Sequence, residues 1–348
     1  MPAESLVRIG PSHYHVGHIV PAMVATEMTY FEEEGLTSHA LYHGGLIPAI
    51  AETVALRRAM TEKSVDITPD VKPSAVFALA ERGEDVHIVG CWRNRQDFNW
   101  YGARGIDSFA DLKGKRLGVR DIGGIDHISL RTAVKRFGLD PDKDVTFVRG
   151  AKFHPHEHPE RALREGEADV VALNGTDDQG LVEDGFKLLL TSRELYPRGR
   201  ADRVIIATER MVEEEPELLE AYLRATIRAY WFITDYDLNR PYLEALVKRL
   251  RQTCLDAEEA SRSGLEGGGR LSLPFDGAPS VEALRDMVAE GQEFGELADD
   301  FDLEPVLRLE FVERAFKDLK ARPGLADQMQ RVRGIFAARG PDELPPGL

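Results

Sequence analysis

The spacing of apolar residues changes repeatedly between two patterns along the first half of the chain. Short apolar runs, typical of buried strands, are followed by longer stretches in which apolar residues recur every three or four positions, as in helices. Strands that alternate with helices predict βαβ units, mostly parallel sheets and helices on both sheet faces. The predicted elements of this first cycle are strands Leu6–Gly10, Ser38–Tyr42, Val65–Thr68 and Val86–Gly90, and helices Pro21–Glu34, Ile47–Thr61 and Pro73–Arg82.

A second cycle of strands and helices begins near Phe98. It is followed by a strand at Arg203–Thr208 and by a long amphipathic helix at Glu217–Asp235. Ser261–Pro279 is rich in Gly, Ser and Pro, which predicts a flexible surface loop. The elements predicted in the second cycle are strands Arg116–Val119, Val145–Val148, Val170–Leu173 and Lys187–Leu190, and helices Asp126–Phe137, Pro159–Glu165 and Gln179–Asp184.

Composition narrows the class of protein. A chain of 348 residues with 43% hydrophobic content can bury two cores. A formal net charge of −16 argues against a nucleic-acid partner, which would need a clustered basic surface. No stretch approaches the roughly 18 apolar residues of a membrane helix, so no membrane insertion is predicted. Met1–Ser5 leads directly into the first strand without a basic or apolar leader, so we expect a cytoplasmic protein.

Five segments carry a resemblance to a known family. They are VRIG at Val7–Gly10, YFEEEGL at Tyr30–Leu36, VDIT at Val65–Thr68, DLKGKRLGV at Asp111–Val119 and EADVVALNG at Glu167–Gly175. In this order and spacing, the chain from Leu6 to Asp235 resembles type II periplasmic-binding-protein-like folds. The resemblance is to the NMT1/THI5-like and sulfonate-binding (SsuA-like) branch, which also includes cofactor-free lyases of the dihydroxyphthalate decarboxylase type.

The resemblance implies an α/β fold of two lobes. Each lobe would be a mostly parallel sheet flanked by helices, with the ligand cleft between the lobes. Lobe 1 would contain residues 1–97 plus 204–348, including a C-terminal helical extension, and lobe 2 residues 98–203. The hinge crossings would lie near 93–100 and 199–204.

Ligands of open α/β sheets bind beyond the carboxyl ends of the strands, and one predicted loop there carries paired glycines. Gly123 and Gly124 would let the main chain approach a ligand, and the helix that follows offers N–H groups and a positive dipole end to an anion. Alternatively, the pair only makes a tight turn, with Asp126 as the N-cap. In the family that the chain resembles, this position commonly meets the ligand.

Histidines gather in the first predicted ligand loop. His13 and His15 are two residues apart, so in extended chain both imidazoles lie on one side and suit proton transfer. We predict His13, His15 and Asp66 as catalytic residues, although Asp66 can instead brace a helix end. His13, His15 and His18 leave a transition-metal site open as an alternative, but no standard zinc motif supports it. A second group, His154, His156 and His158, lies among prolines and is predicted to be a solvated loop.

Further polar and aromatic residues lie at the other strand ends. Arg93 can pair with a carboxylate or form an ion pair at the hinge, and Trp92 can stack on a planar ligand. Cys91 ends a buried strand and is predicted to be a small core residue. The residues that we predict to contact the ligand are Ser12, Tyr14, His43, Trp92, Arg93, Gly123, Gly124, Asp126, His127 and Asn174.

Two functions compete. The absent leader favours a cytoplasmic, cofactor-independent lyase of the decarboxylase type, acting on an aromatic carboxylate or a similar acid. The alternative is a non-catalytic solute-binding protein of the ABC-transporter type for a sulfonate or a carboxylate. In both, the partner is a small anionic ligand, no cofactor is expected apart from the alternative metal, and a homodimer stays open.

Overall fold

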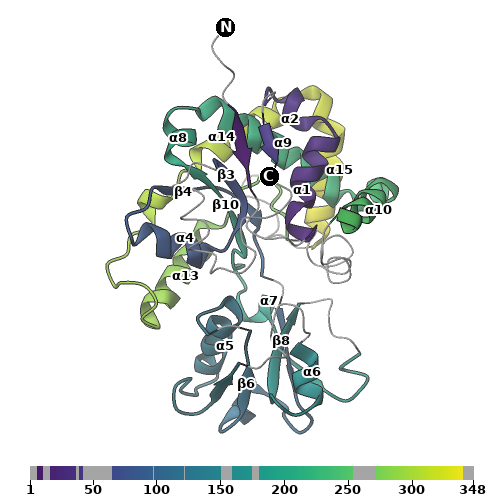
Figure 1. Cartoon of the computed structure of the whole chain (residues 1–348). Helices are drawn as coiled ribbons and strands as arrows, with labels where there is room; N and C mark the ends of the chain where they lie inside the picture. The colour runs from purple at the N-terminus through teal and green to yellow at the C-terminus, as the bar shows by residue number, and fades with distance from the viewer. Residues whose placement is uncertain are drawn as a thin grey trace. The chain divides into compact units, whose positions relative to one another are not determined.

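The computed structural model describes residues 6–10, 16–36, 39–41, 65–96, 98–120, 122–149, 159–174, 180–253 and 272–339. The chain divides into two compact units (Figure 1). Unit 1 contains Met1–Gln96 and Arg200–Leu348, and unit 2 contains Asp97–Gly199. The chain therefore leaves unit 1 once, completes unit 2 and returns.

The sheet of unit 1 has five strands in the order β2-β1-β3-β10-β4. Strands β1 (Val7–Ile9), β2 (His39–Leu41) and β3 (Ile67–Val71) are parallel. Strand β10 (Arg203–Thr208) is antiparallel to β3 and to β4 (Val86–Arg93). The strand that returns from unit 2 is thus inserted between two strands formed earlier in the sequence.

Unit 2 repeats this arrangement in the order β7-β6-β8-β5-β9. Strand β6 is parallel to β7 and β8, whereas β5 is antiparallel to β8 and β9. The predicted α/β class with two mostly parallel sheets is therefore confirmed. The strands of this sheet are β5 (Phe98–Gly102), β6 (Arg116–Gly118), β7 (Thr146–Val148), β8 (Val170–Asn174) and β9 (Lys187–Thr191).

Apolar runs form the central strands because both sheet faces are covered. Successive side chains of a strand point to opposite faces. In β10, Val204 and Ile206 join the core on the side of α4 (Pro73–Ala80) and α13 (Val281–Glu293). Ile205 joins the core on the side of α1 (Val16–Glu27) and α9 (Pro216–Thr234). In Figure 1, the two groups of helices lie on opposite sides of this sheet. A run without polar interruption is what such a strand requires.

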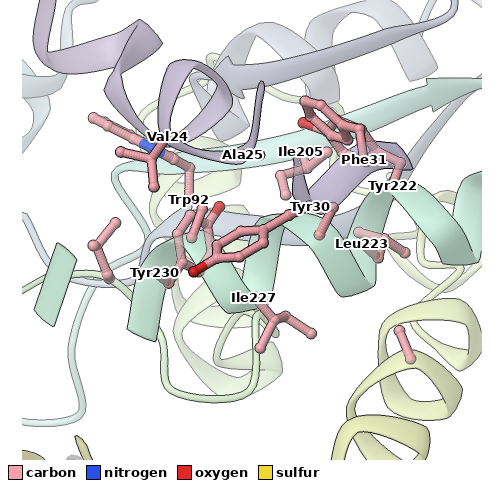
Figure 2. Packing of buried hydrophobic residues seen from close by; sticks show 14 of the residues in the cluster. Val24, Ala25, Tyr30, Phe31, Trp92, Ile205, Tyr222, Leu223, Ile227 and Tyr230 are labelled. Atoms are coloured by element: carbon pink, nitrogen blue, oxygen red, sulfur yellow. The ribbon is translucent and has the colours of Figure 1, made fainter. Parts of the chain in front are cut away.

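Helix α9 (Pro216–Thr234) is the central helix of unit 1. It is buried on almost every side, and Tyr222 and Tyr230 are each 1% exposed. Figure 2 shows Val24 of α1, Trp92 of β4 and Tyr230 of α9, which belong to one buried hydrophobic cluster. The other helices of unit 1 are α1 (Val16–Glu27), α2 (Tyr30–Glu33), α8 (Glu209–Glu213), α10 (Tyr236–Thr253), α14 (Glu310–Lys320) and α15 (Ala326–Arg339), with short 3-10 turns at Glu304–Val306 and Pro323–Leu325.

The sheet of unit 2 also buries both faces. Val170 and Ala172 of β8 pack on the side of α5 (Ile125–Arg136), while Val171 and Leu173 pack on the side of α6 (Pro159–Arg164). Figure 1 shows these two helices on either side of the strands. A 3-10 turn at Phe109–Leu112 and helix α7 (Ser192–Leu195) complete the unit.

Two predicted helices differ from the structure. The predicted helix Pro21–Glu34 is divided into α1 and α2 because Thr29 adopts a left-handed backbone with φ 58°. The described part of the predicted helix Gln179–Asp184 is a turn. Strand β3 also extends beyond the prediction, so Pro69 and Asp70 belong to the strand and not to the loop after it.

The prediction of a flexible surface loop is wrong for Ser272–Pro279. Leu273 and Phe275 are 3% and 1% exposed. The main chain of this segment runs along β4, where Cys91 N–H donates to the carbonyl of Gly277 at 2.7 Å and Asn94 N–H donates to that of Ser272 at 2.8 Å. Its glycines and prolines therefore shape a segment that is packed against the sheet.

Candidate functional site

The loop between β6 and α5, together with the first turn of α5, brings together four predicted ligand residues, Gly123, Gly124, Asp126 and His127. Because β6, β7 and β8 are parallel, this loop lies at the carboxyl edge of the unit 2 sheet. Gly123 has a φ of +79°, and a Cβ there would meet no described atom within 4 Å. The backbone conformation, and not a lack of space, is the reason for glycine at this position.

The N-terminus of α5 has no side-chain cap. Gly124 is the N-cap residue, with φ −73° and ψ 166°, so the alternative prediction of Asp126 as N-cap is wrong. Asp126 lies in the first turn and is 5% exposed. Its Oδ2 accepts the main-chain N–H of Arg120 at 2.6 Å, so its carboxylate is held against the preceding loop.

The buried side chain of His127 is hydrogen-bonded to the same loop. Its side chain is 6% exposed and meets the ring of Phe147 edge-on, with 4.5 Å between centroids. Gly123 N–H donates to His127 Nδ1 at 3.0 Å, which requires a neutral ring with its proton on Nε2. Burial, followed by the positive charge of Arg131, lowers the pKa of His127 and favours this neutral form.

Arg120 is a candidate that the sequence analysis missed. Its guanidinium lies over the ring of Phe98, 5.5 Å from the centroid, and forms no ion pair within the described ranges. Phe98 pairs with Asn174 in the sheet, so this cation lies at the same sheet edge as the glycine loop. A basic residue at the start of the β6–α5 loop, three residues before the glycine pair, is the sequence signal that could have identified it.

Asp66 is positioned for support. It precedes β3, at the amino end of the strand, and is 3% exposed. Its carboxylate lies 3.1 Å from Arg8 Nε and 2.9 Å from a terminal nitrogen of Arg210 in α8, and it accepts the main-chain N–H of Arg8 at 2.8 Å. This geometry favours the alternative interpretation, in which Asp66 braces a helix end, over proton transfer.

Trp92 and Arg93 are engaged within unit 1. Trp92 is 5% exposed and belongs to the core beneath α1 (Figure 2). Arg93 lies 5.6 Å from the centroid of the Trp92 ring and 3.2 Å from a carboxylate oxygen of Asp202, with which it forms an ion pair inside unit 1. Contact of either residue with a ligand stays a prediction.

Cys91 is the core residue that was predicted. Its thiol is fully buried and donates to the carbonyl of Arg203 at 3.2 Å. Burial raises the pKa of Cys91 well above its usual value, which disfavours the thiolate that a nucleophile needs.

The remaining predicted site residues lie outside the described residues or lack a described side chain. Within the described ranges, no three His, Cys, Asp or Glu side chains converge as metal ligands would. The predicted residues beyond these ranges are Ser12, His13, Tyr14, His15, His43, His154, His156 and His158, and the main chain alone is described for His18 in α1 and Asn174 in β8. The described helices include none with the length and apolar character needed to cross a membrane.

Comparison with known proteins gives both a family and a fold. The sequence model of the family described as NMT1/THI5 like matches residues 17–237. A search of the curated proteins found no match.

Three solved structures illustrate the likeness in fold. A putative periplasmic sulfonate-binding protein SsuA from Methylobacillus flagellatus is 18% identical to this chain. The match covers 92% of this chain and 96% of the SsuA chain, with a TM-score of 0.67. The periplasmic aliphatic sulphonate-binding protein SsuA from Escherichia coli, also 18% identical, covers 87% and 92% with a TM-score of 0.61. A mutant of the enzyme DszB in complex with biphenyl-2-sulfinic acid is 13% identical and covers 90% and 99%, with a TM-score of 0.57. At these identities the likeness establishes the shared two-lobed fold.

Proposed function

The chain belongs to the NMT1/THI5-like family, and from this premise we propose that it binds a small organic anion such as a sulfonate or a carboxylate. The family match includes the whole β6–α5 loop. Two of the similar structures are sulfonate-binding proteins by name. Support for the proposal therefore comes from the family, the fold and the chemistry of one loop.

The observation that supports this proposal most directly is the geometry of the β6–α5 loop. The first N–H groups of a helix have no partner within the helix, and the dipole makes this end positive. Gly124 adds no side chain over that end, so an anionic group can approach the main chain closely. The carboxylate of Asp126 offsets part of this attraction, and the guanidinium of Arg120 supplies the positive charge that the loop needs.

A non-catalytic binding role is supported better than the decarboxylase-type lyase that the sequence analysis preferred. The sulfonate-binding proteins of similar fold favour the alternative, and the carboxylate of Asp66 is paired with Arg8 and Arg210. A lyase remains the second proposal because the desulfurization enzyme DszB has the same fold. Its chemistry here would depend on His13 and His15.

One binding experiment tests the proposal. Purified protein is titrated by calorimetry with alkanesulfonates, benzenesulfonate and benzoate, and each mixture is analysed by mass spectrometry for product. We expect binding without a change in ligand mass. Release of CO2 or of a sulfur oxide would instead establish the lyase.

The Gly124→Val variant tests the location of the site. The backbone angles of Gly124 suit any residue, so the variant should fold with a Tm within a few degrees of wild type. The added side chain should lower anion affinity at least tenfold. Gly334→Val, at an exposed glycine of α15, is the matched control. Unchanged affinity in Gly124→Val would show that the anion binds elsewhere.

A further inference from the structure

The β6–α5 loop is held by two side chains of the helix that follows it. Asp126 accepts the N–H of Arg120, and His127 accepts the N–H of Gly123. Both side chains are buried, at 5% and 6% exposure, so water competes little for these hydrogen bonds. The loop conformation therefore depends on the protonation state of one imidazole.

We propose that His127, in its neutral form, is a positioning residue that holds Gly123 in its left-handed turn and thereby makes anion binding at this loop dependent on pH. This inference rests on the proposed function for its link to binding. The hydrogen bond between Gly123 and His127 rests on the geometry alone.

Protonation of His127 removes the acceptor. In the imidazolium form both ring nitrogens carry hydrogen, so the N–H of Nδ1 would point at the N–H of Gly123, 3.0 Å away between the two nitrogens. Two donors cannot share this contact, and the loop must move. The φ of +79° at Gly123 would then lose the interaction that selects it.

The surroundings of His127 determine the direction of the pH effect. The charged groups that act on the ring are Arg131 and Asp126 of α5 and Asp142 of the turn before β7, while Phe147 of β7 packs against the ring. Burial, followed by Arg131, lowers the pKa of His127, and the two aspartates oppose this without reversing it. A histidine whose pKa is lowered on folding contributes stability above the unfolded value of 6.5 and loses it as the pH falls through the folded value. The hydrogen bond from Gly123 to His127 should therefore be present above pH 6.5 and lost in acid.

Replacement of His127 by asparagine separates the effect of the hydrogen bond to Gly123 from the effect of the charge on the ring. An imidazolium would itself attract an anion, which opposes the effect of loop opening. In His127→Asn, the side-chain oxygen can take the place of Nδ1 as acceptor but does not titrate. In His127→Ala, the acceptor is absent at every pH.

The experiment measures affinity for butanesulfonate and benzoate between pH 8 and pH 5. Wild type should lose at least fivefold in affinity towards pH 5, His127→Asn should keep its affinity across the range, and His127→Ala should bind weakly throughout. His87→Asn is the control, because His87 pairs with Glu209 in unit 1 at 2.5 Å and lies outside this loop. Wild-type affinity that is constant with pH, or that rises in acid, overturns the inference.

Nitrogen-15 NMR of wild type tests the loop without a ligand. We expect His127 to have its proton on Nε2, and the Gly123 amide signal to shift with the same midpoint as the imidazole. A proton on Nδ1 would contradict the inference even where both anions bind. Absence of binding by wild type at pH 8, together with the expected NMR result, would instead overturn the proposed function alone.

Discussion

Glu34 is a fully buried carboxylate that three guanidinium groups surround. Its side chain is 0% exposed, and its oxygens lie 2.9 Å from Arg224, 2.7 Å from Arg228 and 2.7 Å from Arg322. Burial alone would raise the pKa of Glu34, but hydrogen bonds from Arg322, Arg228 and Arg224 hold it below its usual value. A buried charge is tolerated here because both carboxylate oxygens accept hydrogen bonds from arginine side chains.

Replacement of Glu34 by Gln should destabilise the protein by about 3 kcal/mol, since it leaves the arginines around a neutral group. Glu32→Gln, at an exposed acid two residues earlier in α2, is the control and should change little. Urea unfolding at pH 7 measures both.

The pH dependence of stability tests the same network. A carboxylate whose pKa is lowered on folding stabilises above its unfolded pKa and loses that contribution as the pH falls through the lower folded value. Wild type should therefore lose more stability than Glu34→Gln when the pH falls below about 4.5. Equal losses would contradict the role of Glu34.

At the scale of elements, Ser272–Ser280 covers the outer edge of β4. Ser280 N–H donates to the side chain of Asn94 at 2.9 Å, and Phe275 packs against Trp231, with ring centroids 5.7 Å apart. The composition of this segment predicts a loop because Gly, Ser and Pro disfavour helices and central strands. Composition cannot reveal a sheet edge that is built almost two hundred residues earlier in the chain.

Gly277→Ala should destabilise unit 1 by about 2 kcal/mol or more beyond the cost of backbone strain. Gly277 has a φ of +78°, and a Cβ there would lie 2.8 Å from Cγ1 of Ile227. Gly295→Ala is the control, because Gly295 has a similar φ of +68° with no atom within 4 Å of the added carbon. Equal losses of unfolding free energy in the two variants would show that Ile227 makes room.

At the scale of the whole molecule, each unit has a five-stranded sheet with an antiparallel strand in the fourth place, which is the last strand of unit 1 in the sequence and the first strand of unit 2. In each unit, the carboxyl edge of the parallel strands is the place where a ligand is expected. The β6–α5 loop of unit 2 is the described element at such an edge that has paired glycines, a cation and a helix N-terminus.

The location of the protein in the cell belongs to this scale. We propose a cytoplasmic location beside the binding function, as a separate point to be tested. Fractionation of cells that express the native gene, with the protein detected by antibody, measures it. Recovery outside the cytoplasm would favour a transport receptor.

The sequence by itself determined the alternation of strands and helices and the glycine loop after β6. These features depend on local periodicity and on backbone preferences, which neighbouring residues impose. Only the tertiary structure decided that β10 lies between β3 and β4, that Asp66 pairs with Arg8 and Arg210, and that His127 accepts from Gly123. Such partners are selected by the path on which the chain returns and by the rotamer that packing allows, and no local pattern encodes either.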